Sequence, residues 1–354
     1  MHASQSISGS GHRASTPFWL AAFGAAALLC STAEPAFGAT RIRLATLAPD
    51  GSVYHKSLLA LRDEWRRISQ NQVNLTVFSG GKLGGEADVV QQRGLGSVQA
   101  AMITTVGLAA IEPAVEGLQS IPMGFRDFAE VDYVGKRLQP MLEERLEAKG
   151  YVVLGWSDAG WIHFFSKQPV TVPDDLKRLK MFAWAGNTET VAVYRSRGFT
   201  AVPLETADIV PGLETGLIEV VPCPPVFALK SQIDRRAPYM LEINWAPLVG
   251  ALVIRKATWD ALPASLRGPM LKAAQAVAND IKQAGRSEGE ESVKAMIARG
   301  LQVTRPTPEV IELWRREAEA AYPLIRGRVV QAEVFDRALQ LLEEFRAGKP
   351  GPNP

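Results

Sequence analysis

Apolar and polar residues in the first part of the chain follow a strand–helix–strand pattern. Apolar positions in 41–44 predict a short strand, and the spacing of Leu58, Leu61 and Trp65 predicts an amphipathic helix. Residues 73–78 alternate between apolar and polar, as in a half-buried strand. The pattern continues with a helix at 87–95 and strands at 100–103 and 151–154. Strands that alternate with helices predict a layered α/β fold.

The second half repeats this alternation without repeating the sequence. Its expected elements are a strand at 179–183, a helix at 188–197, a strand at 200–203, a helix at 207–215 and a strand at 218–221. After a strand at 248–254 the pattern is helical, with one long helix over 264–297 that Gly285 and Gly289 could interrupt, and further helices from Thr307-Pro308 and over 334–345. We therefore expect two α/β lobes and a long C-terminal helical region.

An apolar run at 18–29 stands out near the N-terminus. Its length suits the hydrophobic part of a signal peptide and falls short of the about 20 apolar residues that span a bilayer. A small-residue cleavage pattern follows at 36–38, so we expect residues 1–38 to be a signal peptide and the mature chain to be exported to the periplasm. The alternatives are a buried N-terminal helix and a lipid anchor at Cys30, which the bulky Leu29 disfavours.

Composition excludes several classes of protein. The 354 residues suggest about two domains, and 47% hydrophobic with 21% charged residues is typical of a globular protein with a sizeable core. The 39 Lys and Arg nearly balance 37 Asp and Glu, so the chain lacks the basic excess of nucleic-acid-binding proteins. Beyond residue 38 no window of about 18 residues is apolar throughout, and we expect a soluble mature chain.

Two motifs resemble those of enzymes but lack the required partners. The Gly-rich turn at 80–86 matches neither phosphate-binding glycine motif, and a strand-to-helix turn explains its glycines equally well. Gly155-Trp156-Ser157-Asp158-Ala159 resembles the nucleophile elbow of α/β hydrolases, which need a late histidine. The only histidine after Ser157 is His163. A hydrolase that uses Ser157 remains an alternative to a serine that lines a cleft or is merely hydrogen-bonded.

The remaining reactive and aromatic residues suggest a binding cleft. His55 and His163 lack neighbours at metal-ligand spacing, so we expect no metal, and Cys223 among prolines is typical of a buried, inert thiol. Three tryptophans lie near predicted strand ends between the lobes, namely Trp156, Trp161 and Trp184. Ligands of α/β folds bind at the carboxyl ends of strands, so we expect these rings to cluster there, for ligand stacking or for core packing.

Four parts of the chain, in order and at matching spacing, resemble the solute-binding proteins of TRAP transporters, the DctP family. They are 78–89 with 96–100, 175–181, 213–219 and 259–263. The resemblance implies a two-lobed periplasmic solute-binding protein fold with hinge strands, which closes on a small solute and delivers it to a membrane permease driven by an ion gradient. It implies no covalent chemistry and no cofactor, so the chain is expected not to be an enzyme.

The resemblance also implies an organisation and a set of partners. Lobe one is expected over 40–160, completed by part of 249–300, and lobe two over 161–248. Helices in 300–346 would pack on the lobes, and 348–354 would be a loose tail. The expected partners are a small-molecule solute and the TRAP permease subunits, without nucleic acid, and the chain is expected to be a monomer or a weak dimer.

Three positions depart from the family's pattern. The family usually has an arginine directly after the segment that ends at Met181, where it binds a ligand carboxylate, and this chain has Phe182. A second frequent arginine corresponds to Ile162, and a common asparagine corresponds to Cys223 or a neighbour. An apolar side chain cannot replace a charge-assisted contact, so these departures put carboxylate binding in doubt.

These departures predict the chemistry of the ligand. The expected apolar lining is Phe182, Ile162, Trp161, Trp184, Trp156 and Cys223. The candidate polar contacts are Asp158, His163, Thr104 and Thr105. Such a pocket favours a largely apolar or aromatic solute, because a carboxylate would be desolvated there without a partner. The alternatives are an organic-acid receptor, in which Arg126 or Lys180 supplies the missing cation, and a carrier of a lipid or another hydrophobic ligand.

Overall fold

The computed structural model describes residues 39–94 and 97–348, which belong to the compact unit Phe37–Pro354. The expected signal peptide at 1–38, the lipid-anchor alternative at Cys30 and the tail at 349–354 lie outside the described residues. Among the helices that are described, none has the length and apolar character needed to cross a membrane.

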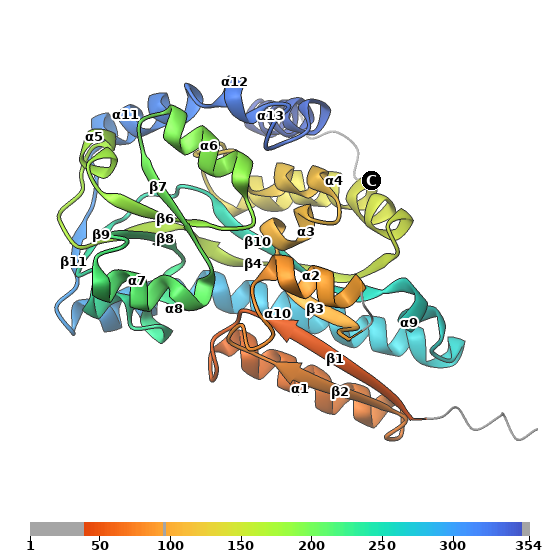
Figure 1. Cartoon of the computed structure of the whole chain (residues 1–354). Helices are drawn as coiled ribbons and strands as arrows, with labels where there is room; N and C mark the ends of the chain where they lie inside the picture. Colours follow the sequence, from red (N-terminus) through yellow and green to blue (C-terminus); the bar gives the residue numbers. More distant parts are fainter. Residues whose placement is uncertain (1–38, 95–96, 349–354) are drawn as a thin grey trace, which may run out of the picture. The chain divides into compact units, whose positions relative to one another are not determined.

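The first of two sheets has five strands in the order β2-β1-β3-β10-β4. Its strands are β1 (Thr40–Thr46), β2 (Val73–Phe78), β3 (Ala100–Thr104), β4 (Tyr151–Trp161) and β10 (Pro247–Arg255). β1, β2 and β3 are parallel, and β10 runs antiparallel between β3 and β4. One face is covered by α1 (Val53–Ile68), because Leu58, Leu61 and Trp65 form a fully buried stripe on that helix (Figure 1). The other face packs against α3 (Thr105–Ala109), η1 (Pro113–Leu118) and α4 (Phe128–Ala148), beside α2 (Glu86–Gly94).

The second sheet has six strands in the order β11-β9-β5-β8-β6-β7. They are β5 (His163–Ser166), β6 (Lys180–Trp184), β7 (Thr200–Leu204), β8 (Val220–Cys223), β9 (Tyr239–Leu241) and β11 (Gln302–Thr304). The helical segments between them are α5 (Pro173–Lys177), α6 (Thr188–Ser196), η2 (Thr206–Asp208), α7 (Ile209–Thr215), α8 (Pro225–Lys230) and η3 (Ile233–Arg235). α7 ends at Gly216, whose φ of 73° is left-handed and therefore favours glycine.

The chain passes between the sheets three times: twice through short adjacent connections, and once through residues 256–301, which lead from β10 to β11. The first joins β4 to β5 through Ile162, and the second joins β9 to β10 through residues 242–246. They are hydrogen-bonded to each other, because Ile162 N donates to Ala246 O (2.9 Å) and Trp245 N donates to Ile162 O (3.2 Å). The two connections therefore form a paired link between the sheets.

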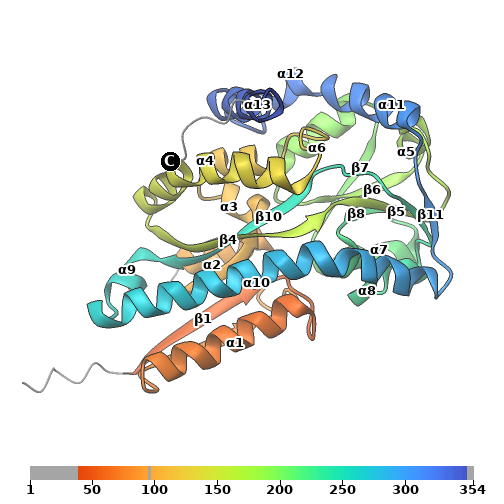
Figure 2. The same ribbon diagram turned by 180° about the vertical axis from the view of Figure 1, so that it is seen from behind.

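The C-terminal helices form further contacts with the elements around both sheets. After α9 (Lys256–Asp260), the helix α10 (Ala264–Ile297) runs beside α1 and β4 and on to α8 (Figure 2). It continues without a break through Gly285 and Gly289, so the interruption expected there is wrong. α11 (Pro308–Glu319) packs on α5, α12 (Tyr322–Ile325) on α6, and α13 (Ala332–Arg346) on α4. In both views these last helices lie along one side of the molecule (Figures 1 and 2).

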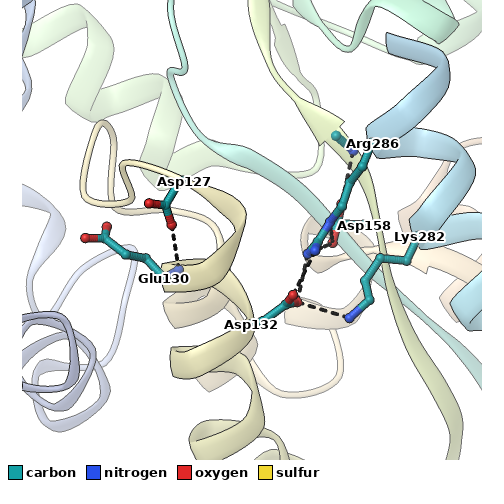
Figure 3. A network of polar contacts seen from close by, with 7 residues as sticks. Asp127, Glu130, Asp132, Asp158, Lys282 and Arg286 are labelled. Carbon is teal, nitrogen blue, oxygen red and sulfur yellow. Dashed lines mark hydrogen bonds and ion pairs between the residues drawn. The ribbon is translucent and has the colours of Figure 1, made fainter. Parts of the chain in front are cut away.

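An ion-pair network fixes α10 to β4 and α4. Arg286 on α10 donates to both carboxylate oxygens of Asp158 on β4 (2.7 and 3.2 Å) and to those of Asp132 on α4 (2.8 Å), while Lys282 donates to Asp132 (3.0 Å) (Figure 3). Asp158 is only 4% exposed. Burial raises the pKa of its carboxyl, and the hydrogen bonds from Arg286 oppose that rise. The guanidinium of Arg286 also lies 4.2 Å from the ring centroid of Phe128.

A buried glutamate links an element that packs on the first sheet to a helix beside the second. Glu116 in η1 is 3% exposed and accepts hydrogen bonds from Ser120 Oγ and from Nδ2 of Asn187 (3.1 Å). Asn187 is the N-cap of α6, so this contact joins η1, which packs on the first sheet, to a helix that follows a strand of the second. Burial raises the pKa of Glu116 to about 7, against a hydrogen bond from Ser120 that lowers it.

Replacing Arg286 by Met should destabilise the protein by about 3–5 kcal/mol, because it leaves the Asp158 carboxylate buried without its partner. The matched control is Lys282→Met, whose pair with Asp132 is more exposed and should contribute less than about 1 kcal/mol. Urea unfolding monitored by circular dichroism measures both free energies. Equal losses in the two variants would contradict the special role of Arg286.

Replacing Glu116 by Gln should flatten the pH dependence of stability. The folded-state pKa lies above the unfolded value of 4.5, so the group's contribution is fully present below pH 4.5 and is lost as the pH rises through about 7. Across that window Glu116→Gln should remove a decline of about 3 kcal/mol in the free energy of unfolding, measured by urea titration at several pH values. The control is Glu290→Gln, exposed on α10, and a wild-type profile in Glu116→Gln would argue against the assignment.

Candidate functional site

A cavity lies where strands of both sheets end, and we call it the cleft cavity. Its volume is about 110 Å³. Its walls include Thr46, Thr104 and Ser157 from the first sheet, and Phe182, Trp184 and Cys223 from the second. Thr46, Thr104, Trp184 and Cys223 each stand at the carboxyl end of a strand that pairs in parallel with a neighbour. This is where ligands of α/β folds bind.

A second cavity of about 90 Å³ lies on the other side of Phe182 and Trp184, and we call it the side cavity. Its walls come from α6, from the connection before β10 and from the C-terminal helices, and include Ile162, Val193, Tyr194, Trp245, Ala321 and Ile325. Phe182, Trp184 and Pro222 line both cavities. Phe182 and Trp184 project from the same face of β6 because they are two residues apart, and their rings meet edge to face at 5.0 Å.

The charged groups at the cleft cavity are acidic and already bonded. Its charged lining residues within the described chain are Glu86 and Asp158. Glu86 accepts hydrogen bonds from N and Oγ1 of Thr104 (2.7 and 2.6 Å) and from Gly107 N (2.9 Å). Asp158 is held by Arg286. The cleft cavity therefore presents no lysine or arginine from the described residues to a ligand carboxylate.

The side cavity has one cationic wall residue in the described chain, Arg197. Its guanidinium lies 2.9 Å from Oε1 of Glu317, which also accepts from Lys177 (3.0 Å). The cations expected to substitute for the missing arginine line neither cavity. Lys180 is exposed and donates to Gly216 O (3.0 Å), and Arg126 lines a separate surface pocket with Glu242.

The structure brings together six of the ten expected site residues. Thr104, Asp158, Phe182, Trp184 and Cys223 line the cleft cavity, and Ile162 lines the side cavity. Burial raises the pKa of the Cys223 thiol, which is 3% exposed, so the sulfur is kept as an unreactive thiol.

The other four residues line neither cavity, and the expected cluster of three tryptophans does not form. Trp156 donates from Nε1 to Glu143 (2.8 Å), in a polar groove between α4 and α10, and Trp161 stacks on Phe128 with ring centroids 5.0 Å apart. His163 Nδ1 donates to Ile243 O (2.9 Å), and burial lowers its pKa to about 4, which keeps the ring neutral. Thr105 begins α3 and is fully buried.

The resemblance of 155–159 to a nucleophile elbow is misleading. β4 continues through these residues to Trp161, so Ser157 stands within a strand rather than at a strand-to-helix turn. Its Oγ is buried and has no hydrogen-bond partner, and it therefore lacks the general base that activates a catalytic serine. Ser157 lines the cleft cavity instead.

Sequence reasoning missed Thr206 and the existence of a separate side cavity, although it selected Ile162, Phe182 and Trp184 among that cavity's wall residues. Thr206 follows the carboxyl end of β7, a position that the strand-end rule could have selected. The side cavity had no comparable signal, because its walls come from segments more than 100 residues apart, from Val106 to Val329.

The model of one protein family, described as bacterial extracellular solute-binding protein, family 7 (DctP), matches residues 44–326. The chain is 25% identical over 238 residues to the C4-dicarboxylate-binding periplasmic protein DctP of Rhodobacter capsulatus, covering 65% of this chain and 69% of that protein. It is 22% identical to the sialic acid-binding periplasmic protein SiaP of Vibrio cholerae, covering 80% and 88%.

Solved structures share the fold. The sugar acid binding protein DctPAm of Advenella mimigardefordensis, in complex with galactonate, superposes with a TM-score of 0.81 at 18% identity and covers 87% of this chain and 99% of that one. A TRAP periplasmic solute-binding protein of Ralstonia eutropha with bound (S)-2-acetolactate superposes with a TM-score of 0.80 at 16% identity, covering 86% and 99%. The family model spans well over half of the sequence, and the chain therefore belongs to family 7 of the bacterial extracellular solute-binding proteins, the DctP family of TRAP transporters.

Proposed function

We propose that this chain captures a small solute in the cleft cavity and delivers it to the permease subunits of a TRAP transporter. Members of its family are periplasmic solute-binding proteins and not enzymes, and they work with membrane permease subunits. The observation that carries the proposal is the cleft cavity itself, walled by the carboxyl ends of strands from both sheets.

Several finer points belong to the same proposal. The two sheets are the cores of the two lobes, with lobe one at 40–160 completed by part of 249–300 and lobe two at 161–248, to which β11 adds one strand. The paired connections at Ile162 and Ala246 are the hinge strands. Residues 1–38 are a signal peptide that directs export.

An organic acid is the solute class that the relatives favour. Those that match are named for C4-dicarboxylates, 2,3-diketo-L-gulonate and sialic acid, and the DctPAm structure holds galactonate. In this chain the carboxylate would reach Arg197 in the side cavity. Glu317 would keep Lys177 as its partner, so Arg197 could exchange Glu317 for the solute without leaving that carboxylate unpaired.

A second candidate is a solute without a free carboxylate. Phe182, which is 1% exposed, and Cys223 occupy the cleft cavity where the family pattern suggests an arginine and an asparagine, and the cavity's two carboxylates are held by the protein. A carboxylate at this point would be desolvated among apolar groups without a cation. This observation favours an uncharged, largely apolar or aromatic solute.

Calorimetric titration with succinate, N-acetylneuraminate and galactonate distinguishes the two classes. An organic-acid receptor should bind at least one of them at micromolar concentration, and Arg197→Met should weaken that binding about 100-fold, because the desolvated carboxylate loses its cation. The control is Arg178→Met, an exposed arginine outside both cavities. If no organic acid binds to wild type, the organic-acid candidate is wrong.

Restoring the family's arginine should not by itself restore carboxylate binding. In Phe182→Arg the guanidinium would be desolvated against Trp184, while Ile162 and Cys223 would still offer no charge to the acid. We expect succinate to bind no better than tenfold more tightly to the variant than to wild type, measured by calorimetry. Micromolar binding gained by this single change would show that Phe182 alone excludes carboxylates.

A further inference from the structure

Polar atoms without partners gather around the two cavities. Six buried side-chain polar atoms in the described chain have no hydrogen-bond partner, and four belong to residues that line the cavities. They are Ser157 Oγ and Thr206 Oγ1 in the cleft cavity, Thr190 Oγ1 in the side cavity, and Trp184 Nε1 between the two. We call the three residues that line both cavities, Phe182, Trp184 and Pro222, the partition. Leaving a buried polar group unpaired is unfavourable, so a bound solute that pairs with these atoms would gain affinity.

The partition restricts the chemistry of that solute. The indole N–H of Trp184 can only donate, so the matching group on the solute must be an acceptor. No lysine or arginine of the described chain lines the cleft cavity, and a charged acceptor at Trp184 would gain a counter-ion only by displacing Glu317 from Arg197 in the side cavity. The acceptor that fits is uncharged, such as a ketone or ester carbonyl.

The side cavity suits an apolar group. Several polar groups that line it are already bonded: Gln119 Oε1 accepts from Val249 N (2.8 Å), Asn187 bonds both Thr190 N and Glu116, and Arg197 is paired with Glu317 (2.9 Å). Much of its remaining wall is aliphatic or aromatic, including Val193, Trp245 and Ala321.

The sizes of the cavities point to one solute across both. Each is smaller than a cavity of about 150 Å³, the size that accepts benzene in a protein core. Either cavity alone therefore holds only part of a solute, and the two are separated by the shared side chains of Phe182, Trp184 and Pro222.

We propose that the side cavity is a second subsite of the solute site, and that the solute is an elongated, uncharged molecule with an acceptor bonded to Trp184 and an apolar group in the side cavity. This inference rests on the proposed function, since it assumes that the cleft cavity holds the transported solute. Opening the partition requires Phe182 or Trp184 to turn about its side-chain bonds, which rearranges the edge-to-face pair but breaks no hydrogen bond to Trp184 Nε1.

The test uses a series of phenyl ketones from acetophenone to valerophenone, titrated by calorimetry into the full mature chain. We expect affinity to rise about fourfold with each added methylene as the tail fills the side cavity. Trp184→Phe should weaken every member about tenfold, because it removes the N–H donor and keeps the ring. A series in which no member binds overturns the inference.

Filling the side cavity gives the decisive comparison. Val193→Phe, or the smaller change Ala321→Leu if the first does not fold, should abolish the gain with tail length. If the variant instead weakens the binding of every ketone by the same factor, the phenyl ring rather than the alkyl tail occupies the side cavity, which also supports the subsite. The matched control Leu313→Phe lies on an exposed position and should change nothing. Wild-type binding of the whole series by a folded side-cavity variant overturns the inference.

The melting temperature separates this inference from the proposed function. A solute that binds in the cleft cavity should raise the melting temperature of the wild-type chain by mass action. If an organic acid or a ketone raises the melting temperature but Val193→Phe has no effect on binding, only the subsite is wrong. If no solute of either class raises the melting temperature, the proposed function itself fails.

Discussion

The close approach of α10 to β4 is the constraint on which the rest of the structure depends. A Cβ at Gly285 would lie 2.9 Å from the backbone of Asp158 and Ala159, and a Cβ at Gly160 would lie 2.8 Å from Gly285 O. Glycine at these positions lets the helix backbone touch the strand directly, which no larger residue permits. The approach buries Asp158 beneath the helix, and that burial in turn requires Arg286, placed one residue beyond Gly285, to compensate its charge.

This contact also determines what the cleft can offer a solute. β4 carries Ser157 and Asp158 to the cleft cavity and continues to Ile162 at the connection to the second sheet. Asp158 accepts hydrogen bonds from Arg286, and Glu86 accepts them from Thr104 and Gly107. The acidic groups at the cleft cavity therefore stabilise the fold rather than bind a ligand. The groups that remain unpaired are neutral donors and hydroxyls, and they are what distinguishes this cleft electrostatically from one with an arginine at the position of Phe182.

Local patterns in the sequence were sufficient for most elements and for half of the site. The pattern over 179–183 predicted β6, observed at Lys180–Trp184, whereas Phe182 and Cys223 were selected as site residues by the resemblance to the family's pattern. The run 155–159 resembled a nucleophile elbow, yet it lies within β4, where Gly155 and Gly160 serve contacts with a helix more than 100 residues later. Neither their role nor the stacking of Trp161 on Phe128 has a local signature, since both depend on which helix covers the strand.

The side cavity has no local sequence signature either, because distant segments of the chain build its walls. Its walls are assembled by the return of α11 and α12 across α6, after the chain has completed both sheets. A cavity built last in the chain order can vary without disturbing the strands that hold the cleft, since Val193, Ala321 and Ile325 lie on helices and their connections rather than on strands. The cleft and the side cavity can therefore change separately, except at Phe182, Trp184 and Pro222, where a change in one cavity alters the other.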